Sequence, residues 1–175
     1  VRSRRQRQMC IRDSFITGTN GKTTTLSFLS QILENNDVKH ATSGTLGTFI
    51  NKQKIFNNEL TTEEPVFIRN LMSKCFRSNI KNIIFEASSI GVDKNRLQGL
   101  KVNHAIFTNI SRDHLDYHGS LKNYINAKFK LVSNAEVKTL AVNFDDEIIS
   151  NQLKKLSSSK TSVSYTHLTL PTTPY

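Results

Sequence analysis

The sequence contains 175 residues, of which 24 are Lys or Arg and 14 are Asp or Glu, and its formal net charge is +10 at pH 7. This length is enough for one domain with a buried core, and no apolar run is long enough to cross a bilayer or to form a secretory signal. The positive charge would suit a nucleic-acid partner, but five arginines fall within residues 1–14 and the remaining excess is Lys-rich and scattered.

Both ends of the chain differ from its middle. Residues 1–14 and 163–175 resemble translated sequencing-adapter read-through, and the two strings are similar to the two strands of one transposon-end adapter. We expect both segments to be non-native and exclude them from fold reasoning. The alternative for residues 1–14 is a basic arm that binds nucleic acid, but the arm has no aromatic residue to stack on bases. The informative part, residues 15–162, is then a fragment of a larger protein.

Cysteine usage indicates a reducing environment. Cys10 lies in the suspect N-terminal segment, and Cys75 alone gives no disulfide framework, so we expect Cys75 to be a buried or half-buried helix residue. A reducing compartment fits a cytoplasmic protein. We also expect a monomer that binds small-molecule substrates and neither nucleic acid nor membrane.

The first informative element is a short apolar strand, Phe15-Ile16, and the loop Thr17-Gly-Thr-Asn-Gly-Lys-Thr-Thr-Thr25 follows it. A helix is predicted over residues 21–35, because apolar residues recur there with a period of 3.6. Strand, glycine loop and helix in this order are what a phosphate-binding loop requires.

The loop has the residues that a triphosphate needs. Gly18 and Gly21 allow a tight turn, so that consecutive N–H groups point into one concavity at the positive end of the helix. Lys22 can reach the terminal phosphates, and the Thr23 hydroxyl can ligate Mg²⁺. The spacing departs from the common pattern G-x-x-x-x-G-K-[ST], since Ile16 stands where the first glycine would fall. The alternative is a Gly-Asn turn with an ordinary N-capping threonine.

Strands and helices alternate downstream of the loop. Residues 40–42 read as a strand, 44–47 as a loop, and the polar, Asn-rich residues 48–60 as a hairpin or an excursion. Thr61–Pro65 has the hydroxyl caps, acids and proline of a helix start, and the helix continues to about Arg77. The further expected strands are 82–87, 104–109 and 139–143, and the further helices are 121–132 and 145–156. This alternation predicts an α/β fold with a parallel sheet flanked by helices.

Polar residues follow each apolar strand, where the carboxyl ends of parallel strands converge. Glu86 ends one strand and His114 follows another, so both are expected near Thr23. An acid, an imidazole and a hydroxyl beside a triphosphate loop suit a Mg²⁺ site. The alternatives are a salt-bridged carboxylate at Glu86 and a turn-capping imidazole at His114.

Lys128 interrupts an apolar helix face. It lies four residues after Tyr124 and three after Ile125, on the same side of the helix. Such a lysine either extends its amine outward to solvent or is kept buried for a purpose. Burial lowers a lysine pKa, and the uncharged amine can then be carbamylated by CO₂.

Five stretches resemble the Mur ligases, in particular the MurE branch. The loop Thr17–Thr25 is similar to the ATP loop of that family and of its folylpolyglutamate synthase relatives. Glu86-Ala-Ser-Ser-Ile-Gly-Val-Asp-Lys-Asn-Arg96 resembles E-V-S-S-H-G-L-x-x-x-R. Phe107-Thr-Asn-Ile-Ser-Arg-Asp-His-Leu-Asp-Tyr-His-Gly119 with Tyr124-Ile-Asn-Ala-Lys128 resembles F-T-N-L-S-R-D-H-L-D-Y-H-G with Y-x-x-A-K, and Ala141-Val-Asn-Phe-Asp-Asp-Glu147 resembles I-N-x-D-D-E.

The resemblance implies part of the central, ATP-binding domain of an ATP- and Mg²⁺-dependent ligase. That ligase adds meso-diaminopimelate or L-lysine to UDP-MurNAc-L-Ala-D-Glu through an acyl phosphate, in peptidoglycan precursor synthesis. Three groups of residues carry over by position. ATP would be held by Gly18, Thr19, Asn20, Gly21, Lys22, Thr23 and Thr24. Thr23, Glu86, His114 and the carbamate of Lys128 would serve the metal, with Lys22, His114 and Lys128 catalytic. Thr61, Thr62, Ser88 and Arg96 would bind the UDP-muramoyl dipeptide.

Three residues depart from the family pattern. Ile90 replaces a usual histidine, Lys94 replaces a frequent glutamine, and Glu63 replaces the proline of Thr-Thr-Pro. Because the remaining parts of the resembled enzymes bind the uridine nucleotide and the incoming amino acid, we expect the fragment alone not to ligate.

The alternatives are another Mur ligase or a folylpolyglutamate synthase and, more distantly, a P-loop NTPase. The NTPase would need an acid poised to activate water, which nothing in the sequence marks.

Overall fold

In a computed structural model of the chain, residues 12–133, 137–156 and 163–165 are described. Their strands form one sheet in the order β4-β3-β2-β5-β1-β6-β7-β8. The strands are β1 (Arg12–Thr17), β2 (His40–Gly44), β3 (Gly47–Ile50), β4 (Gln53–Phe56), β5 (Asn82–Glu86), β6 (His104–Phe107), β7 (Thr139–Val142) and β8 (Val163–Tyr165). The helices are α1 (Lys22–Asn35), α2 (Pro65–Arg77), α3 (Ser89–Asp93), α4 (Leu115–His118), α5 (Leu121–Ser133) and α6 (Glu147–Leu156).

The sheet is parallel except at one edge. β2, β5, β1, β6, β7 and β8 run parallel, which confirms the predicted α/β class. β3 and β4 form the antiparallel edge, so residues 48–60 contain the hairpin that was one of two alternatives for them. The strands of this edge are antiparallel because the connection Asn51-Lys52 is far too short for a parallel crossover.

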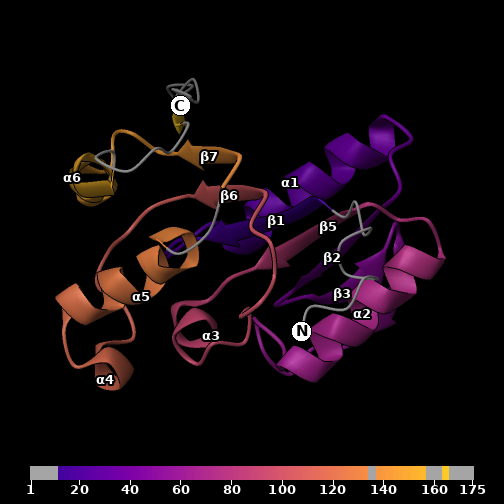
Figure 1. Cartoon of the computed structure of the whole chain (residues 1–175), viewed down its shortest axis with the longest axis horizontal. Coiled ribbons are helices and arrows are strands. Elements are labelled where there is room, and N and C mark those ends of the chain that lie inside the picture. The colour runs from indigo at the N-terminus through magenta and orange to yellow at the C-terminus, as the bar shows by residue number, and fades with distance from the viewer. Residues whose placement is uncertain (1–11, 134–136, 157–162, 166–175) are drawn as a thin grey trace, which may run out of the picture.

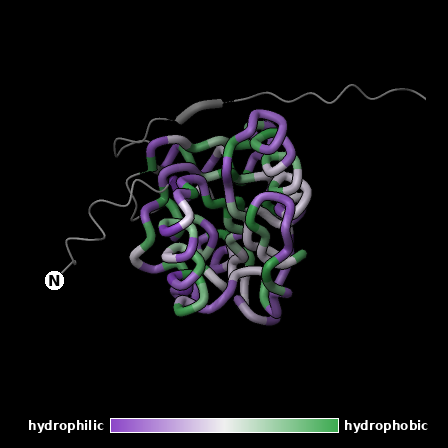
Figure 2. Tube along the Cα trace, turned by 90° about the vertical axis from the view of Figure 1, so that its right-hand side faces the viewer, coloured by the Kyte–Doolittle hydropathy of each residue, from purple (hydrophilic) through white to green (hydrophobic). Residues whose placement is uncertain are grey.

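Strand alternation gives the sheet two apolar faces. Phe15 packs in the larger core with α2, α5 and α6, whereas the next residue, Ile16, packs with Leu26 of α1 in a smaller cluster. Figure 1 accordingly shows α1 on one side of the sheet and α2, α3 and α5 on the other. Hydrophobic and hydrophilic stretches alternate along the trace in Figure 2, as expected for a sheet covered on both faces.

The order of the strands decides where a site can form. β1 lies between β5 and β6, with Ile16 opposite Glu86 and Thr17 opposite Phe107. The chain continues from β1 to β2 on one side of β1 and reaches β6 on the other. Such a reversal opens a crevice beyond the carboxyl ends of the strands, where ligands bind in open α/β sheets.

The first and last strands include residues near the two chain ends. β1 begins at Arg12 and β8 at Val163, inside the segments predicted to be non-native, and that origin stays a prediction. Cys10 lies outside the described residues, whereas Cys75 is free and buried, as predicted. Within the described residues, no helix combines the length and apolar character needed to span a membrane.

Asp13 is a buried carboxylate in β1, 3% exposed. Among the described residues its Oδ1 has no hydrogen-bond partner, and burial raises the pKa of the carboxyl from 3.8 to about 7. Between these two values the folded chain holds a proton that the unfolded chain has released. The free energy of unfolding should therefore fall as the pH rises from about 4 to about 7, by at most about 4 kcal/mol.

Asp13→Val should remove this part of the pH dependence and raise stability at pH 8. Chemical denaturation between pH 4 and pH 8 measures both effects. Asp116→Asn, at an exposed carboxylate, serves as the control and should leave the pH dependence of the wild type in place. An Asp13→Val protein with the same pH dependence as the wild type would contradict the assignment.

Candidate functional site

The loop between β1 and α1 depends on two glycines with positive φ. Gly18 has φ 146° and Gly21 has φ 81°, and Gly21 stands immediately before the first residue of α1. The first N–H groups of an α-helix have no acceptor within the helix, so the start of α1 presents donors and a positive partial charge. This is the geometry predicted for the loop from the sequence.

The residues that follow β6 form hydrogen bonds with the loop. Thr108 Oγ1 donates to the Asn20 carbonyl at 2.6 Å, and the Thr19 N–H donates to the Asn109 carbonyl at 2.8 Å. The Asn109 amide pairs with the Asn20 backbone twice, accepting from its N–H at 3.0 Å and donating to its carbonyl at 3.1 Å. These contacts hold the loop in one conformation.

Two lysines converge on one carbonyl of the loop. Lys22 Nζ lies 2.9 Å from the Gly18 oxygen, and Lys128 Nζ lies 2.7 Å from the same atom. Lys128 is 1% exposed, so its amine is buried rather than extended to solvent. Burial, reinforced by the charge of Lys22 and opposed by Asp113, lowers the pKa of Lys128 to about 7. Burial also lowers the pKa of Lys22, whereas Glu86 and Asp113 raise it.

Glu86 is buried beside the start of α1. Its Oε2 accepts from the Thr23 hydroxyl at 3.0 Å and from the Thr45 hydroxyl at 3.1 Å, and its Oε1 accepts from the Thr45 N–H at 3.0 Å. Gly44 makes room for this carboxylate, because a Cβ at Gly44 would come within 2.6 Å of the Glu86 carboxyl carbon. A carboxylate and a hydroxyl therefore lie together at the loop, as predicted.

The four residues expected to bind a substrate form a second cluster next to Glu86. The Thr62 hydroxyl donates to the Glu86 carbonyl at 2.9 Å and lies 3.1 Å from Ser88 Oγ. Arg96 Nη1 donates to the Thr62 carbonyl at 3.0 Å, while its Nη2 lies 2.9 Å from Glu64. The Thr61 hydroxyl lies 3.2 Å from that of Thr45.

The start of α2 differs from the prediction. The helix begins at Pro65 after Glu64, and neither Thr61 nor Thr62 caps it, because the Thr62 hydroxyl bonds to the end of β5 instead. Glu63, which replaces the family's proline, is buried and accepts from the Glu59 and Leu60 N–H groups at 2.9 and 3.2 Å. The substitution therefore stabilises the turn that precedes the two threonines.

His114 is not joined to Thr23 or Glu86 by any described hydrogen bond. Its exposed ring lies 3.5 Å from Asp113 Oδ2, and its backbone has φ 48° at the start of α4. The described residues contain no cluster of three or more His, Cys, Asp or Glu side chains that could hold a metal. The oxygens at hand are those of Glu86 and Thr23, a set that suits Mg²⁺ when phosphate oxygens complete its shell.

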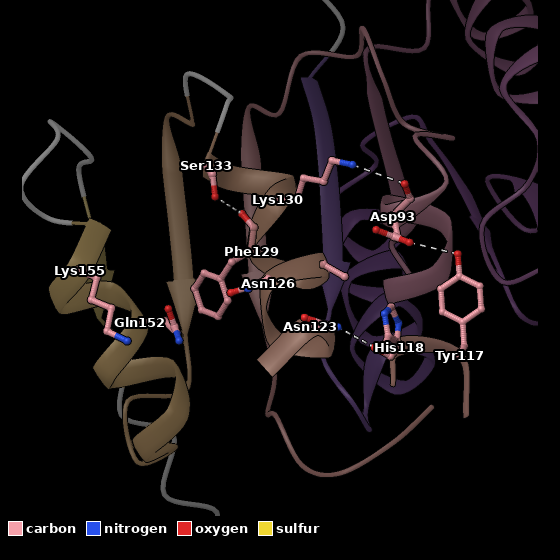
Figure 3. Close-up of a pocket in the computed structure, with 11 residues that line it drawn as sticks. Asp93, Tyr117, His118, Asn123, Asn126, Phe129, Lys130, Ser133, Gln152 and Lys155 are labelled. Atoms are coloured by element: carbon pink, nitrogen blue, oxygen red, sulfur yellow. Dashed lines mark hydrogen bonds between the residues drawn. The ribbon is translucent and has the colours of Figure 1, made fainter. Parts of the chain in front are cut away.

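A separate cavity of about 800 Å³ lies away from the loop, between α3, α4, α5 and α6 (Figure 3). Asp93, Tyr117, His118 and Lys130 are among its lining residues, and no residue of the phosphate loop is. The cavity is therefore distinct from the cluster around Lys22.

Several residues of the site were not predicted from the sequence. Thr45 binds Glu86, Asn109 binds the loop, and Asp113 acts on the pKa of both lysines. Thr45 follows β2 directly, so the rule that polar residues gather after strands would have found it. Asn109 and Asp113 lie in the stretch after β6, where only His114 was singled out.

Comparison with known proteins assigns the family. A family model described as the Mur ligase middle domain matches residues 16–169. The chain belongs to the Mur ligase family. It is 42% identical over 142 residues to the UDP-N-acetylmuramoyl-L-alanyl-D-glutamate–2,6-diaminopimelate ligase of Buchnera aphidicola subsp. Acyrthosiphon pisum, covering 81% of this chain and 28% of that protein. It is also 42% identical over 122 residues to the ligase of the same name from Rickettsia bellii, covering 68% of this chain and 26% of that protein.

Solved structures agree with this assignment. A ligase of the same name superposes with a TM-score of 0.80 at 29% identity, over 93% of this chain and 33% of that one. A folylpolyglutamate synthase from Mycobacterium tuberculosis superposes with a TM-score of 0.70 at 15% identity, over 90% of this chain and 43% of that one, which shows a shared fold only. The chain thus spans about a quarter to a third of the relatives' length.

Proposed function

We propose that this chain is the ATP-binding part of a ligase that joins 2,6-diaminopimelate to UDP-N-acetylmuramoyl-L-alanyl-D-glutamate, a step in cytoplasmic peptidoglycan precursor synthesis. The observation that carries the proposal is the burial of Lys128 against the phosphate loop, where its amine shares the Gly18 carbonyl with Lys22. The relatives that are 42% identical bear the name of this activity.

ATP would bind with its phosphates over residues 18–24. The donors are the N–H groups at the start of α1 and the Lys22 amine, which is free to exchange the Gly18 and Thr19 carbonyls for phosphate oxygens. Mg²⁺ would be held by Thr23 and Glu86 together with those phosphates, and it would neutralise charge that develops during phosphoryl transfer.

The second part of the proposal is a carbamate on Lys128. The uncharged amine nitrogen forms a bond to the carbon of CO₂ and loses a proton, which converts a base into a carboxylate. One N–H remains on the nitrogen and can still donate to the Gly18 carbonyl. Burial favours this reaction, because it lowers the pKa of the amine to about 7 and so increases the uncharged fraction.

The reaction then needs no serine or cysteine nucleophile. The γ-phosphate of ATP passes to the D-glutamate carboxylate, giving an acyl phosphate and ADP. Lys22 and the loop N–H groups stabilise the developing charge. The amine of diaminopimelate attacks the acyl carbon, phosphate leaves, and the nitrogen loses a proton as the amide forms.

The UDP-muramoyl dipeptide would bind at Thr61, Thr62, Ser88 and Arg96. Arg96 supports this role because its buried Nε has no hydrogen-bond partner among the described residues, while its two other nitrogens are held by Thr62 and Glu64. A substrate carboxylate is an acceptor that would satisfy this donor.

The direct test is ligation by the full-length protein, measured as phosphate release and product formation with and without the UDP-muramoyl dipeptide. The proposal expects phosphate release only when both the dipeptide and diaminopimelate are present. Release that is independent of the dipeptide would favour a P-loop NTPase instead. Release that requires a folate substrate in its place would favour a folylpolyglutamate synthase.

Gly44→Ala tests the metal part of the proposal. The added methyl group would displace the Glu86 carboxylate, so we expect the Mg²⁺ concentration for half-maximal nucleotide binding to rise by roughly 10- to 100-fold. Ser43→Ala, on the same strand as Gly44, is the matched control. The Ser43 hydroxyl lies 2.9 Å from Thr48 Oγ1 of the neighbouring strand β3 and makes no described bond to Glu86. An unchanged Mg²⁺ requirement in Gly44→Ala would remove Glu86 from the metal site.

A further inference from the structure

The pattern of α5 marks Tyr124 as one member of an apolar stripe, but the structure gives its hydroxyl a partner in the phosphate loop. Tyr124 is 0% exposed, and its hydroxyl lies 2.9 Å from Thr19 Oγ1. The two residues are 105 positions apart in sequence, so this contact joins α5 directly to the loop after β1.

Thr19 is the point at which three segments meet. Its backbone N–H donates to the Asn109 carbonyl at 2.8 Å, and its Oγ1 accepts from the Ser111 N–H at 2.9 Å. The phenol of Tyr124 is the third partner. The Thr19 hydroxyl also lies 3.3 Å from the Ser111 carbonyl, so loss of the phenol removes one of three contacts from a nearly buried hydroxyl.

The ring of Tyr124 contacts the other half of the site. Lys128 Nζ lies 4.7 Å from the ring centroid, one helical turn further along α5. The ring of His118, in α4, packs edge-on against the Tyr124 ring with the two centroids 5.4 Å apart. The Nε2 atom of His118 lies 3.0 Å from Ser89 Oγ. Tyr124 is therefore fully buried and its ring contacts both Lys128 and His118, which limits its freedom to release Thr19.

We propose that Tyr124 is a positioning residue that ties the phosphate loop to the helix carrying Lys128, through its hydroxyl on Thr19 and its ring beside the lysine amine. This inference rests on the proposed role of the loop in nucleotide binding. The Tyr124 contact thereby acts beside the bond from Lys128 to the Gly18 carbonyl in holding α5 against the loop.

The first test is hydrogen exchange of the chain without nucleotide, so that it does not depend on ATP binding. Tyr124→Phe keeps the ring and removes only the hydroxyl, and we expect roughly tenfold faster exchange of the Thr19 and Ser111 amides. Exchange in α2 should not change. Tyr117→Phe is the matched control, because its hydroxyl bonds Asp93 at 3.1 Å beside the separate cavity (Figure 3). Equal exchange in Tyr124→Phe and wild type would overturn the inference.

A double-mutant cycle distinguishes this contact from general loosening of the helix. Thr19→Val removes the partner oxygen, so Tyr124→Phe made in that background should add no further change in exchange at Ser111. A further change as large as in the wild-type background would overturn the inference.

ATP affinity separates the inference from the proposed function. We expect Tyr124→Phe to weaken Mg-ATP binding roughly three- to tenfold and Tyr117→Phe to leave it unchanged. A wild-type chain that shows the exchange effect and binds no Mg-ATP would contradict the proposed function while upholding the contact. If the wild type binds Mg-ATP and Tyr124→Phe binds it with the same affinity, the inference is contradicted and the proposed function is not.

Discussion

Lys128→Met in the full-length protein should lower the ligation rate by about a thousandfold, the loss expected when a preorganised group at the reacting centre is removed. Methionine retains an unbranched apolar side chain of similar length, so the buried face of α5 should stay packed. The amine that lies 2.7 Å from the Gly18 carbonyl is lost, and with it the place where CO₂ would attach.

The control for this variant is Lys130→Met. Lys130 is exposed on the same helix and lies 3.5 Å from the Asp93 carbonyl, away from the loop. Its removal should leave the ligation rate unchanged. In ¹³C NMR with labelled bicarbonate, a carbamate signal should be present in the wild type and in Lys130→Met and absent in Lys128→Met. Undiminished ligation by Lys128→Met would show that Lys128 is not a catalytic residue.

Gly18→Ala should reduce the affinity for Mg-ATP by about a thousandfold, which corresponds to roughly 4 kcal/mol. Gly18 has φ 146°, a conformation that residues with a Cβ rarely adopt. An added Cβ would also meet Thr108 Oγ1 and come within 3.1 Å of the Asn109 carbonyl oxygen. The loop would have to separate from the residues that follow β6 and lose the contacts that shape it.

Gly99→Ala controls for the cost of a positive φ by itself. Gly99 has φ 83°, and a Cβ there would meet only Arg69 Nη2, at 3.7 Å and far from the loop contacts. This variant should be less stable than the wild type but should bind Mg-ATP with unchanged affinity, as measured by calorimetry. Gly18→Ala with wild-type affinity would refute the close fit between the loop and Thr108.

The elements that were predicted well are those with a strong local signal. The helix at α1 follows from its apolar periodicity and the strand at β5 from its continuous apolar run, and the structure moves their bounds by only one residue. α3 and α4 were missed, because these helices of five and four residues are too short to show a period. The antiparallel edge was left open between a hairpin and an excursion, since polar residues 48–60 carry little periodic information.

Some residues of the candidate site were likewise predicted from a local pattern, and others were found only in the structure. Lys22 and Thr23 were predicted from the loop motif and Glu86 from its place at the end of an apolar strand, and the structure brings the Thr23 hydroxyl within 3.0 Å of Glu86. His114 was predicted by the same rule, yet its ring turns toward Asp113, because the rule gives the edge of the sheet and not the direction of a side chain. Thr45, Asn109 and the Tyr124 hydroxyl act through contacts between distant segments, which no local pattern contains.

The sequence by itself determined the class of the fold, the phosphate loop and the lysine on an apolar helix face, because each depends on residues that are neighbours along the chain. Only the tertiary structure decided that the Lys128 amine meets the Gly18 carbonyl and that the Tyr124 phenol meets Thr19. The physical reason is that hydrogen bonds require partners within about 3 Å. Only the packing of α5 against the end of β1 brings groups more than a hundred residues apart to that distance.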